Sequence, residues 1–332
     1  MTVPAVGALP PVALLLPGQG AQHPGMAVEL YGREPVFTAV LDEFFARLGA
    51  EGALLRSDWL SERPRVPLDE AARAQPLLFA VGYALGRALA ARGVRPAVLL
   101  GHSVGELAAA ALAGVFGLGD VHRVMAARAE ALAGAPAGGM LAVGAPAREV
   151  AGFTDPPDRP DAVVVAAVNA PRHTVLAGPE PRLSRVAEAL GEAGLPWRRV
   201  PARQPFHSPA LEPAAAVFSR GLREVALRPP DVPIRSTRTG LPLLPGQARD
   251  PAFWGGQLAA PVLFWPALDG LLSEGAYTLV EAGPGQGLST PARRHPAVRA
   301  GRSVVLPLLP AGRAGTLRRW EETVDRLSRP GT

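Results

Sequence analysis

The sequence predicts an α/β fold in which a large domain carries a smaller inserted one. Short apolar runs end in glycine-rich turns and lead into segments of good helix formers, an order typical of α/β proteins. This alternation changes between about residues 136 and 203 and then resumes. The chain has 332 residues, 48% of them hydrophobic, which is enough for the core that such a fold requires.

The large domain is expected to span residues 1–135 and 204–332. Apolar runs bounded by turn residues indicate buried strands, and the alanine-rich segment after the second run indicates a helix. In chain order the expected elements are a strand at 12–16, a turn at 17–20, a strand at 97–100, a turn at 101–105, a helix at 106–112 and a strand at 277–280. Stretches rich in proline and arginine at 61–67, 228–251 and 291–302 are expected to be surface loops.

The inserted domain is expected to span residues 136–203. Its apolar and helix-forming segments predict a strand at 140–143, a short helix at 147–153, a strand pair at 162–168 and 174–177, a helix at 183–193 and a last strand at 197–200. This βαββαβ order is typical of a ferredoxin-like unit.

Composition excludes several classes of chemistry. The chain has no cysteine, so disulfides, thiolate metal sites and a cysteine nucleophile are excluded. The formal net charge of +5 comes entirely from scattered arginines, which does not indicate a nucleic-acid-binding surface. No segment predicts a membrane span or a secretory signal, so a cytoplasmic protein is expected.

The segment Gly101-His102-Ser103-Val104-Gly105 matches a nucleophile elbow. In this motif, glycines on both sides of a serine allow a strand to turn sharply into a helix, so that the hydroxyl is exposed at the sheet edge. The predicted strand before it and helix after it provide the required context. Ser103 is therefore the candidate nucleophile, and an ordinary tight turn is the alternative.

A serine nucleophile needs a base, and the chain offers six histidines. Spacing alone does not choose among them. They are His23, His102, His122, His173, His207 and His295. His207 directly follows the inserted unit, a place that would face a cleft between the domains.

These motifs together resemble one family. They are PGQGAQ at 17–22, GHSVGE at 101–106, an arginine at 128, FHS at 206–208 and EAGPG at 281–285. In this order and near this spacing they resemble the malonyl-CoA:acyl carrier protein transacylases and the acyltransferase domains of polyketide synthases. The resemblance covers almost the whole chain and implies an α/β-hydrolase-like large domain.

The resemblance also implies roles for individual residues. Ser103 would be the nucleophile and His207 its general base. A backbone carbonyl of Gln257, in the segment QLAAPV at 257–262, would orient the histidine, so that no acidic third residue is expected. The backbone N–H groups of Gln19 and Val104 would form the oxyanion hole.

The substrate expectations rest on the same resemblance. Arg128 would bind the free carboxylate of a malonyl group, since a guanidinium can contact both oxygens. Phe206 would fill the space beside the acyl α-carbon and favour malonyl over methylmalonyl, and the aliphatic Val104 agrees. The implied partners are malonyl-CoA and an acyl carrier protein with its phosphopantetheine thiol, without a metal or redox cofactor.

Three alternatives remain open at the level of sequence. An acyl hydrolase or thioesterase would form the same acyl-enzyme but pass the acyl group to water. An acyltransferase of the same kind could use another extender such as methylmalonyl-CoA. An inactive interaction module would only hold a carrier protein, which the intact Ser103, His207 and Arg128 argue against.

Overall fold

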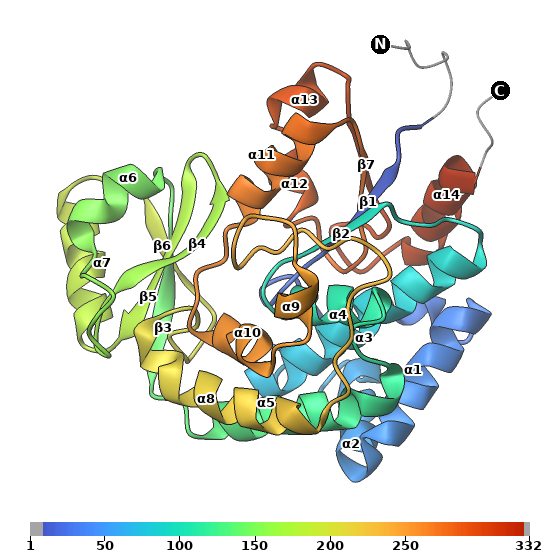
Figure 1. Cartoon of the computed structure of the whole chain (residues 1–332), viewed down its shortest axis with the longest axis horizontal. Coiled ribbons are helices and arrows are strands. Elements are labelled where there is room, and N and C mark those ends of the chain that lie inside the picture. Colours follow the sequence, from blue (N-terminus) through green and yellow to red (C-terminus); the bar gives the residue numbers. More distant parts are fainter. Residues whose placement is uncertain (1–8, 329–332) are drawn as a thin grey trace.

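The computed structural model describes residues 9–328, and within them the strands form two four-stranded sheets. Figure 1 shows the two sheets side by side, one at the left of the molecule and one near its centre. The left-hand sheet and its helices come from the middle of the chain, whereas the central sheet is built from segments on both sides of it. The α/β fold with a small ferredoxin-like part is thereby confirmed.

The central sheet is parallel and has the strand order β2-β1-β7-β8. Its strands are β1 (Val12–Leu16), β2 (Val98–Gly101), β7 (Thr278–Glu281) and β8 (Val304–Pro307). Strands β1, β2 and β7 are almost completely buried, as strands covered by helices on both faces must be. Because parallel strands end at one edge, the turns after β1, β2 and β7 lie together.

Helices surround this sheet, and the longest, α3, packs against α1 and α4. The longer helices are α1 (Pro35–Arg47), α2 (Gly49–Leu60), α3 (Ala71–Ala91), α4 (Val104–Leu112), α5 (Val121–Ala133), α8 (Glu212–Gly221), α11 (Phe264–Glu274) and α14 (Thr316–Ser328). Shorter ones are α9 (Pro245–Ala248), α10 (Pro251–Gly255), α12 (Ser289–Ala292) and α13 (Pro296–Arg299). In the part of the chain described, no helix is both long and apolar enough to cross a membrane.

The second sheet is antiparallel and has the order β4-β5-β3-β6. Its elements in chain order are β3 (Gly138–Val143), α6 (Ala147–Val150), β4 (Val164–Ala170), β5 (His173–Pro179), α7 (Arg182–Glu192) and β6 (Trp197–Val200). A separate core, which includes Leu141, Leu176 and Leu190, lies between this sheet and its helices. The expected βαββαβ order is confirmed.

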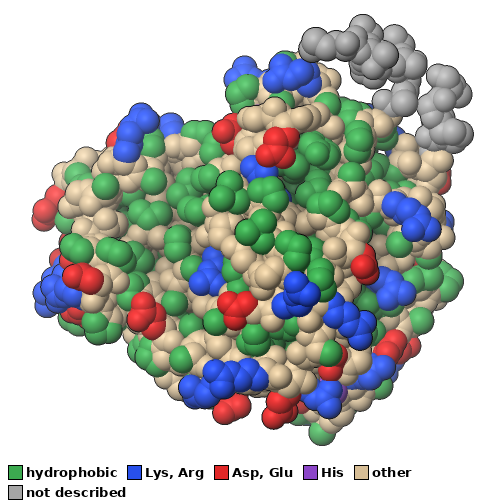
Figure 2. Space-filling model, in the orientation of Figure 1, with side chains coloured by type: hydrophobic (Ala, Val, Ile, Leu, Met, Phe, Trp, Pro, Cys, Tyr) green, Lys and Arg blue, Asp and Glu red, His purple; other side chains and the backbone are tan. Residues whose placement is uncertain are grey.

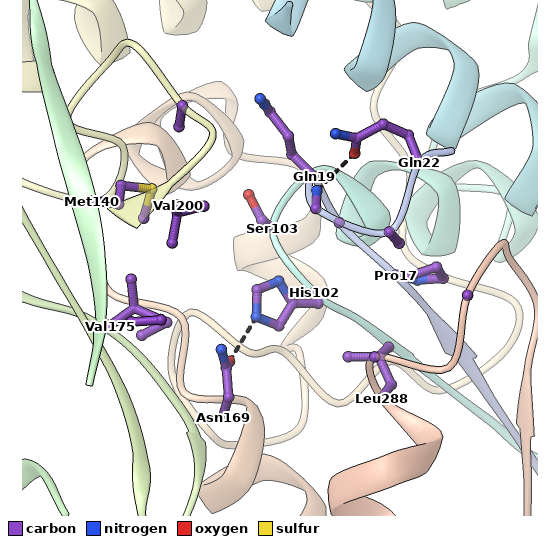
Figure 3. A pocket seen from close by; sticks show the side chains of 18 of the residues that line it. Pro17, Gln19, Gln22, His102, Ser103, Met140, Asn169, Val175, Val200 and Leu288 are labelled. Carbon is purple, nitrogen blue, oxygen red and sulfur yellow. Dashed lines mark hydrogen bonds between the residues drawn. The ribbon is translucent and has the colours of Figure 1, made fainter. Parts of the chain in front are cut away.

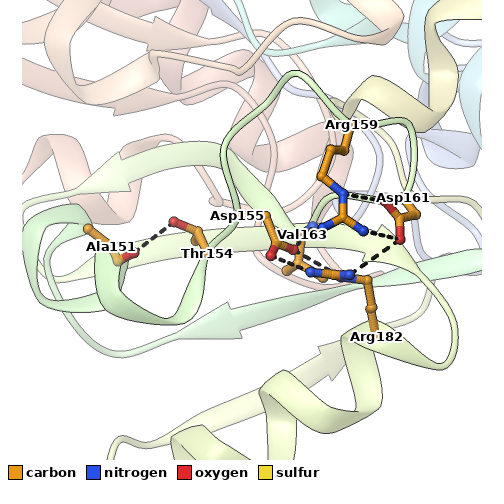
Figure 4. A network of polar contacts seen from close by, with 7 residues as sticks. All are labelled: Ala151, Thr154, Asp155, Arg159, Asp161, Val163 and Arg182. Atoms are coloured by element: carbon orange, nitrogen blue, oxygen red, sulfur yellow. Dashed lines mark hydrogen bonds and ion pairs between the residues drawn. The ribbon is translucent and has the colours of Figure 1, made fainter.

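Polar contacts fix the long loop between α6 and β4, as Figure 4 shows. The Arg182 guanidinium, at the start of α7, pairs with Asp155 and Asp161 in this loop. Asp155 also accepts the backbone N–H of Val163 at 2.9 Å. The ionised form of Asp155 is favoured by Arg182, so its pKa lies below the usual range. These contacts join the loop to the helix beside it.

One loop expectation is wrong and another holds only in part. The stretch 291–302 contains α13 and the end of α12, and the stretch 228–251 contains α9. In α13 and α9 the first helical residue is a proline, a position where the missing N–H costs nothing. The prolines that indicate loops in the sequence here begin helices instead.

Charged side chains are spread over the face shown in Figure 2. Basic and acidic residues alternate there, with apolar side chains between them, and no continuous basic stripe crosses this face. Such a mixed surface gives no strong field of one sign.

Candidate active site

A cavity of about 400 Å³ lies between the two sheets. On one side are the turn after β1 and the elbow after β2, and on the other are side chains of the antiparallel sheet (Figure 3). The residues that line it from the antiparallel sheet include Met140, Ala142, Ala167, Asn169, His173, Val175, Arg198 and Val200. The cavity is therefore walled by both parts of the fold, a common place for ligands.

Ser103 stands at the strained turn between β2 and α4. Its φ of +53° and ψ of −121° are values that residues with a side chain rarely adopt. An added Cβ on Gly101 would lie 2.3 Å from the Glu106 nitrogen, and one on Gly105 would lie 2.1 Å from the Leu16 oxygen. Glycines are thus required on both sides of the serine, as the elbow motif predicts.

His207 meets Ser103 across the cavity. Its Nε2 lies 2.8 Å from Ser103 Oγ, and its Nδ1 lies 3.0 Å from the carbonyl of Gln257 and 2.9 Å from that of Ala260. Since carbonyls only accept, Nδ1 carries the proton and Nε2 is left to accept from the serine. The expected serine, histidine and Gln257 are brought together, and the second carbonyl, from Ala260, was not expected.

Burial keeps His207 neutral. The side chain is 5% exposed, and burial is the main cause that lowers its pKa to about 4. The neighbouring His102 and the positive charge of Arg128 lower the pKa further. A histidine with this pKa is unprotonated at pH 7 and can accept the serine proton.

The backbone N–H groups expected to form the oxyanion hole are free to bind an oxyanion. Within residues 9–328, neither the backbone N–H of Gln19 nor that of Val104 donates a hydrogen bond. Val104 is the first residue of α4, where backbone N–H groups have no partner inside the helix. The turn that carries Gln19 packs closely on the elbow. The distance is so short that a Cβ added to Gly18 would lie 2.4 Å from the His102 oxygen.

Arg128, on α5, is buried without an acidic partner. Its side chain is 3% exposed, and none of the Asp and Glu residues between 9 and 328 forms an ion pair with it. Its Nε donates to Gln75 Oε1 at 2.6 Å, whereas its Nη1 has no hydrogen-bond partner in that range. Burial lowers its pKa to about 10, so the guanidinium stays charged at pH 7.

Gln75 connects Arg128 to the cavity, a role that the sequence did not predict. Arg128 itself is not among the lining residues, but Gln75 is, and its Nε2 donates to Gln19 Oε1 at 2.9 Å. A chain of hydrogen bonds thus runs from the guanidinium to the turn that contains the expected oxyanion donor. The available signal was a polar residue directly before the apolar stretch 76–81 of α3.

Phe206 belongs to the cavity wall, and its expected place beside the acyl α-carbon remains a prediction. It lines the cavity, is 5% exposed, and its ring centroid is 6.5 Å from that of His207. Its aromatic ring is part of the cavity wall directly beside the histidine.

The other histidines divide into two groups. His102, His173 and His23 line the cavity, and His102 Nε2 bonds to Asn169 Oδ1 at 2.8 Å, as Figure 3 shows. His122 and His295 lie outside the lining: His122 is on α5, and His295 pairs with Asp269 and caps α13. His207 is the histidine that contacts the serine.

The fold and the geometry of the site together define a class of protein. An α/β protein with a serine at a strand–helix elbow, and a neutral histidine hydrogen-bonded to it, is equipped to transfer acyl groups through the serine. The comparison with known families agrees with this class. The family model described as the acyl transferase domain matches residues 14–307, so the chain belongs to this family.

Relatives and solved structures extend the comparison. A phenolphthiocerol/phthiocerol polyketide synthase polypeptide from Mycobacterium tuberculosis is 39% identical over 285 residues, covering 86% of this chain and 19% of that protein. The acyltransferase domain from the second module of the salinomycin polyketide synthase is 35% identical, with a TM-score of 0.85 over 98% of this chain and 75% of that one. A malonyl CoA-acyl carrier protein transacylase from Clostridium perfringens shares the fold, with a TM-score of 0.83 over 96% and 97% of the two chains at 24% identity. The chain spans about a fifth of the length of the mycobacterial synthase polypeptide that it matches.

Proposed function

We propose that the chain moves a malonyl group from malonyl-CoA to the phosphopantetheine thiol of an acyl carrier protein, in polyketide or fatty acid biosynthesis. The observation that carries this proposal is the 2.8 Å contact between Ser103 Oγ and His207 Nε2 inside a cavity. The acyl transferase family and the polyketide synthases among the relatives support it. A cytoplasmic location fits substrates of this kind.

The reaction would proceed in two halves. Ser103 Oγ attacks the thioester carbonyl while His207 Nε2 takes the hydroxyl proton, and the N–H groups of Gln19 and Val104 stabilise the oxyanion. The C–S bond then breaks, and His207 returns the proton to coenzyme A as it leaves. In the second half, the carrier thiol gives its proton to His207 and attacks the acyl ester. The bond between the acyl carbon and Ser103 Oγ then breaks, and His207 returns the proton to Oγ. No metal or redox cofactor takes part in these steps.

The preference for a dicarboxylic acyl group is inferred from Arg128. A buried cation without an acidic partner is costly, and a carboxylate of the substrate would relieve that cost. The proposed partner of this carboxylate is the guanidinium of Arg128, whose Nη1 has no hydrogen-bond partner within residues 9–328. Acetyl and other monocarboxylic groups have no free carboxylate once they are joined to coenzyme A.

The preference for malonyl over methylmalonyl is inferred from Phe206. Its bulk beside His207 would leave little room for a branch on the acyl α-carbon. A single methyl group is worth about 1–3 kcal/mol in an apolar pocket, so the expected preference is roughly 10–200-fold.

Intact-protein mass spectrometry tests the proposed function. After mixing with malonyl-, methylmalonyl- and acetyl-CoA, the chain should gain mainly the malonyl mass. Addition of a carrier protein in its phosphopantetheine form should move that mass to the carrier. If the acyl-enzyme decays as fast in buffer as with several carrier proteins, the chain is an acyl hydrolase instead.

A further inference from the structure

Glu106 is a buried carboxyl group beside the elbow for which the proposed reaction gives no role. It lies in the first turn of α4, three positions after Ser103, and its side chain is 0% exposed. A carboxyl group without exposure must be hydrogen-bonded, because its removal from water is costly. Its partners therefore indicate what it does.

The carboxyl group joins two segments of the site. Its Oε2 accepts from Gln257 Nε2 at 2.7 Å, and the Thr237 hydroxyl lies 3.1 Å from the same oxygen. That hydroxyl also donates to the carbonyl of Gly101 at 2.7 Å, on the strand that leads to the elbow. Glu106 thus lies between the elbow and the segment that holds His207.

Gln257 makes one contact through its side chain and another through its backbone carbonyl. Its side chain donates to Glu106, while its backbone carbonyl accepts the Nδ1–H of His207 at 3.0 Å. The second carbonyl on Nδ1 belongs to Ala260, three residues on. A shift of the Gln257 side chain would therefore move the acceptors that set the tautomer and tilt of the imidazole.

The positive charge of Arg238 favours the ionised form of Glu106. Burial is the main cause that raises the pKa of Glu106 to about 7, and the side chains of Ser236, Thr237 and Gln257, with the charge of Arg238, oppose this rise. Arg238 in turn donates to the carbonyl of Phe253. The hydrogen-bond contacts of Glu106 are with Gln257 and Thr237, both at Oε2, and Oε1 has no hydrogen-bond partner within residues 9–328.

We propose that Glu106 is a positioning residue for the base: it holds the Gln257 side chain, and through it the backbone carbonyls that orient His207 toward Ser103. The inference rests on the proposed roles of Ser103 and His207. It predicts that Glu106 affects the reactivity of the serine rather than the binding of the acyl donor.

Two variants separate the parts of this arrangement. Glu106→Gln keeps the shape but replaces the carboxylate, and Gln257→Met removes the donor while the backbone carbonyl remains. Glu34→Gln is the matched control, since Glu34 is also buried but pairs with Arg92 away from the cavity.

The main measurement is the labelling rate of Ser103 by a fluorophosphonate. In this reaction the serine oxygen bonds to phosphorus, fluoride leaves, and His207 accepts the proton. Since the probe contains no malonyl group or coenzyme A, it reports the serine and its base even if the proposed substrate is wrong. Loading from malonyl-CoA, with separate kcat and KM, is the second measurement.

Each single variant should slow labelling and lower kcat by about 10- to 100-fold, with KM within about twofold of the parent. The double variant should be no more than about twofold slower than the slower single one, because both act through one contact. Parent-like labelling rates with a fall in Tm like that of Glu34→Gln would overturn the proposal. Additive losses in the double variant would also overturn it. If labelling follows the proposal while malonyl is not loaded, the proposed substrate fails and the positioning role stands.

Discussion

The two side chains proposed to react belong to residues with a positive φ. Ser103 has a φ of +53° and His207 a φ of +64°. Such conformations are costly for residues with a Cβ and persist only where the surrounding structure imposes them. Here the glycines of the elbow and the three backbone contacts of His207, to Gln257, Leu258 and Ala260, impose them. Within residues 9–328, one further residue with a Cβ has a positive φ, Ala27 at +58°, and it does not line the cavity.

At this scale, Arg128→Ala should lower malonyl loading far more than acetyl loading. Truncation of one partner of a buried charge pair costs about 2–5 kcal/mol, and acetyl has no charge to lose. The measurement is kcat/KM for the two CoA esters. Arg123→Ala, an exposed position on the same helix, is the control and should change neither. Equal losses for both esters in Arg128→Ala would mean that the arginine only supports the fold.

Phe206→Ser should shift the extender preference toward methylmalonyl. The smaller side chain opens space beside the acyl α-carbon, while His207 keeps its two carbonyl partners. The ratio of kcat/KM for malonyl- and methylmalonyl-CoA measures this shift, which should amount to roughly 10–200-fold at most. A parent that prefers methylmalonyl would contradict the assignment, as would a variant with an unchanged ratio.

At the scale of secondary-structure elements, the packing of α4 against β1 requires a glycine where the two backbones come close. A Cβ on Gly105 would lie 2.1 Å from the carbonyl oxygen of Leu16, at the end of β1. Gly105→Ala should therefore push α4 away from the sheet, lower the free energy of unfolding by about 1–3 kcal/mol and reduce malonyl loading. Denaturant unfolding and loading rates are the measurements.

The control for this prediction is Gly246→Ala in α9, where an added Cβ has no neighbour within 4 Å. An alanine there should leave stability unchanged or raise it by about 0.5–1 kcal/mol. If both variants behaved alike, the approach of α4 to β1 would not be the reason for the glycine.

Element types were predicted well wherever a strong pattern stood between turn residues. The strand at 12–16, the elbow and the βαββαβ order follow from apolar periodicity and glycine alone. The helices α9 and α13 were missed because proline marks both a loop and a helix start.

The side chains of the site were predicted only in part. Ser103, His207 and Gln257 were predicted from motifs, and they do meet. Gln75 and the contacts of Glu106 could not be predicted, because they depend on which distant helix faces lie together.

For the whole molecule, the site depends on how the two sheets are joined. His102 bonds to Asn169 across the cavity, and Val262 pairs with β4 through backbone hydrogen bonds to Ala166 and Val168 at 2.9 Å each. Val262 lies two residues after Ala260, one of the two carbonyl partners of His207 Nδ1. The antiparallel sheet is therefore connected directly to the segment whose carbonyls contact the His207 ring. The domain boundaries at 136 and 203 remain a prediction.

Transfer to a carrier protein should depend on Arg198 more than on its neighbours. Arg198 lines the cavity, whereas Arg199 pairs with Glu180 and Arg203 with Glu70. Charges already paired attract an acidic partner less, so Arg198→Gln should slow transfer and weaken its dependence on salt. Arg203→Gln is the control and should change the rate less. Equal effects of the two variants would argue against a docking role for Arg198.

The central claim, that Ser103 carries the acyl group and His207 activates it, is tested most directly by loading from malonyl-CoA followed by mass spectrometry of the peptides. The parent and the control Ser273→Ala, which changes an exposed helical serine, should carry one malonyl group on Ser103. Ser103→Ala should carry none, and His207→Ala should load roughly 10²–10⁴-fold more slowly. A malonyl group on another residue of the parent, or undiminished loading of Ser103→Ala, would contradict the account.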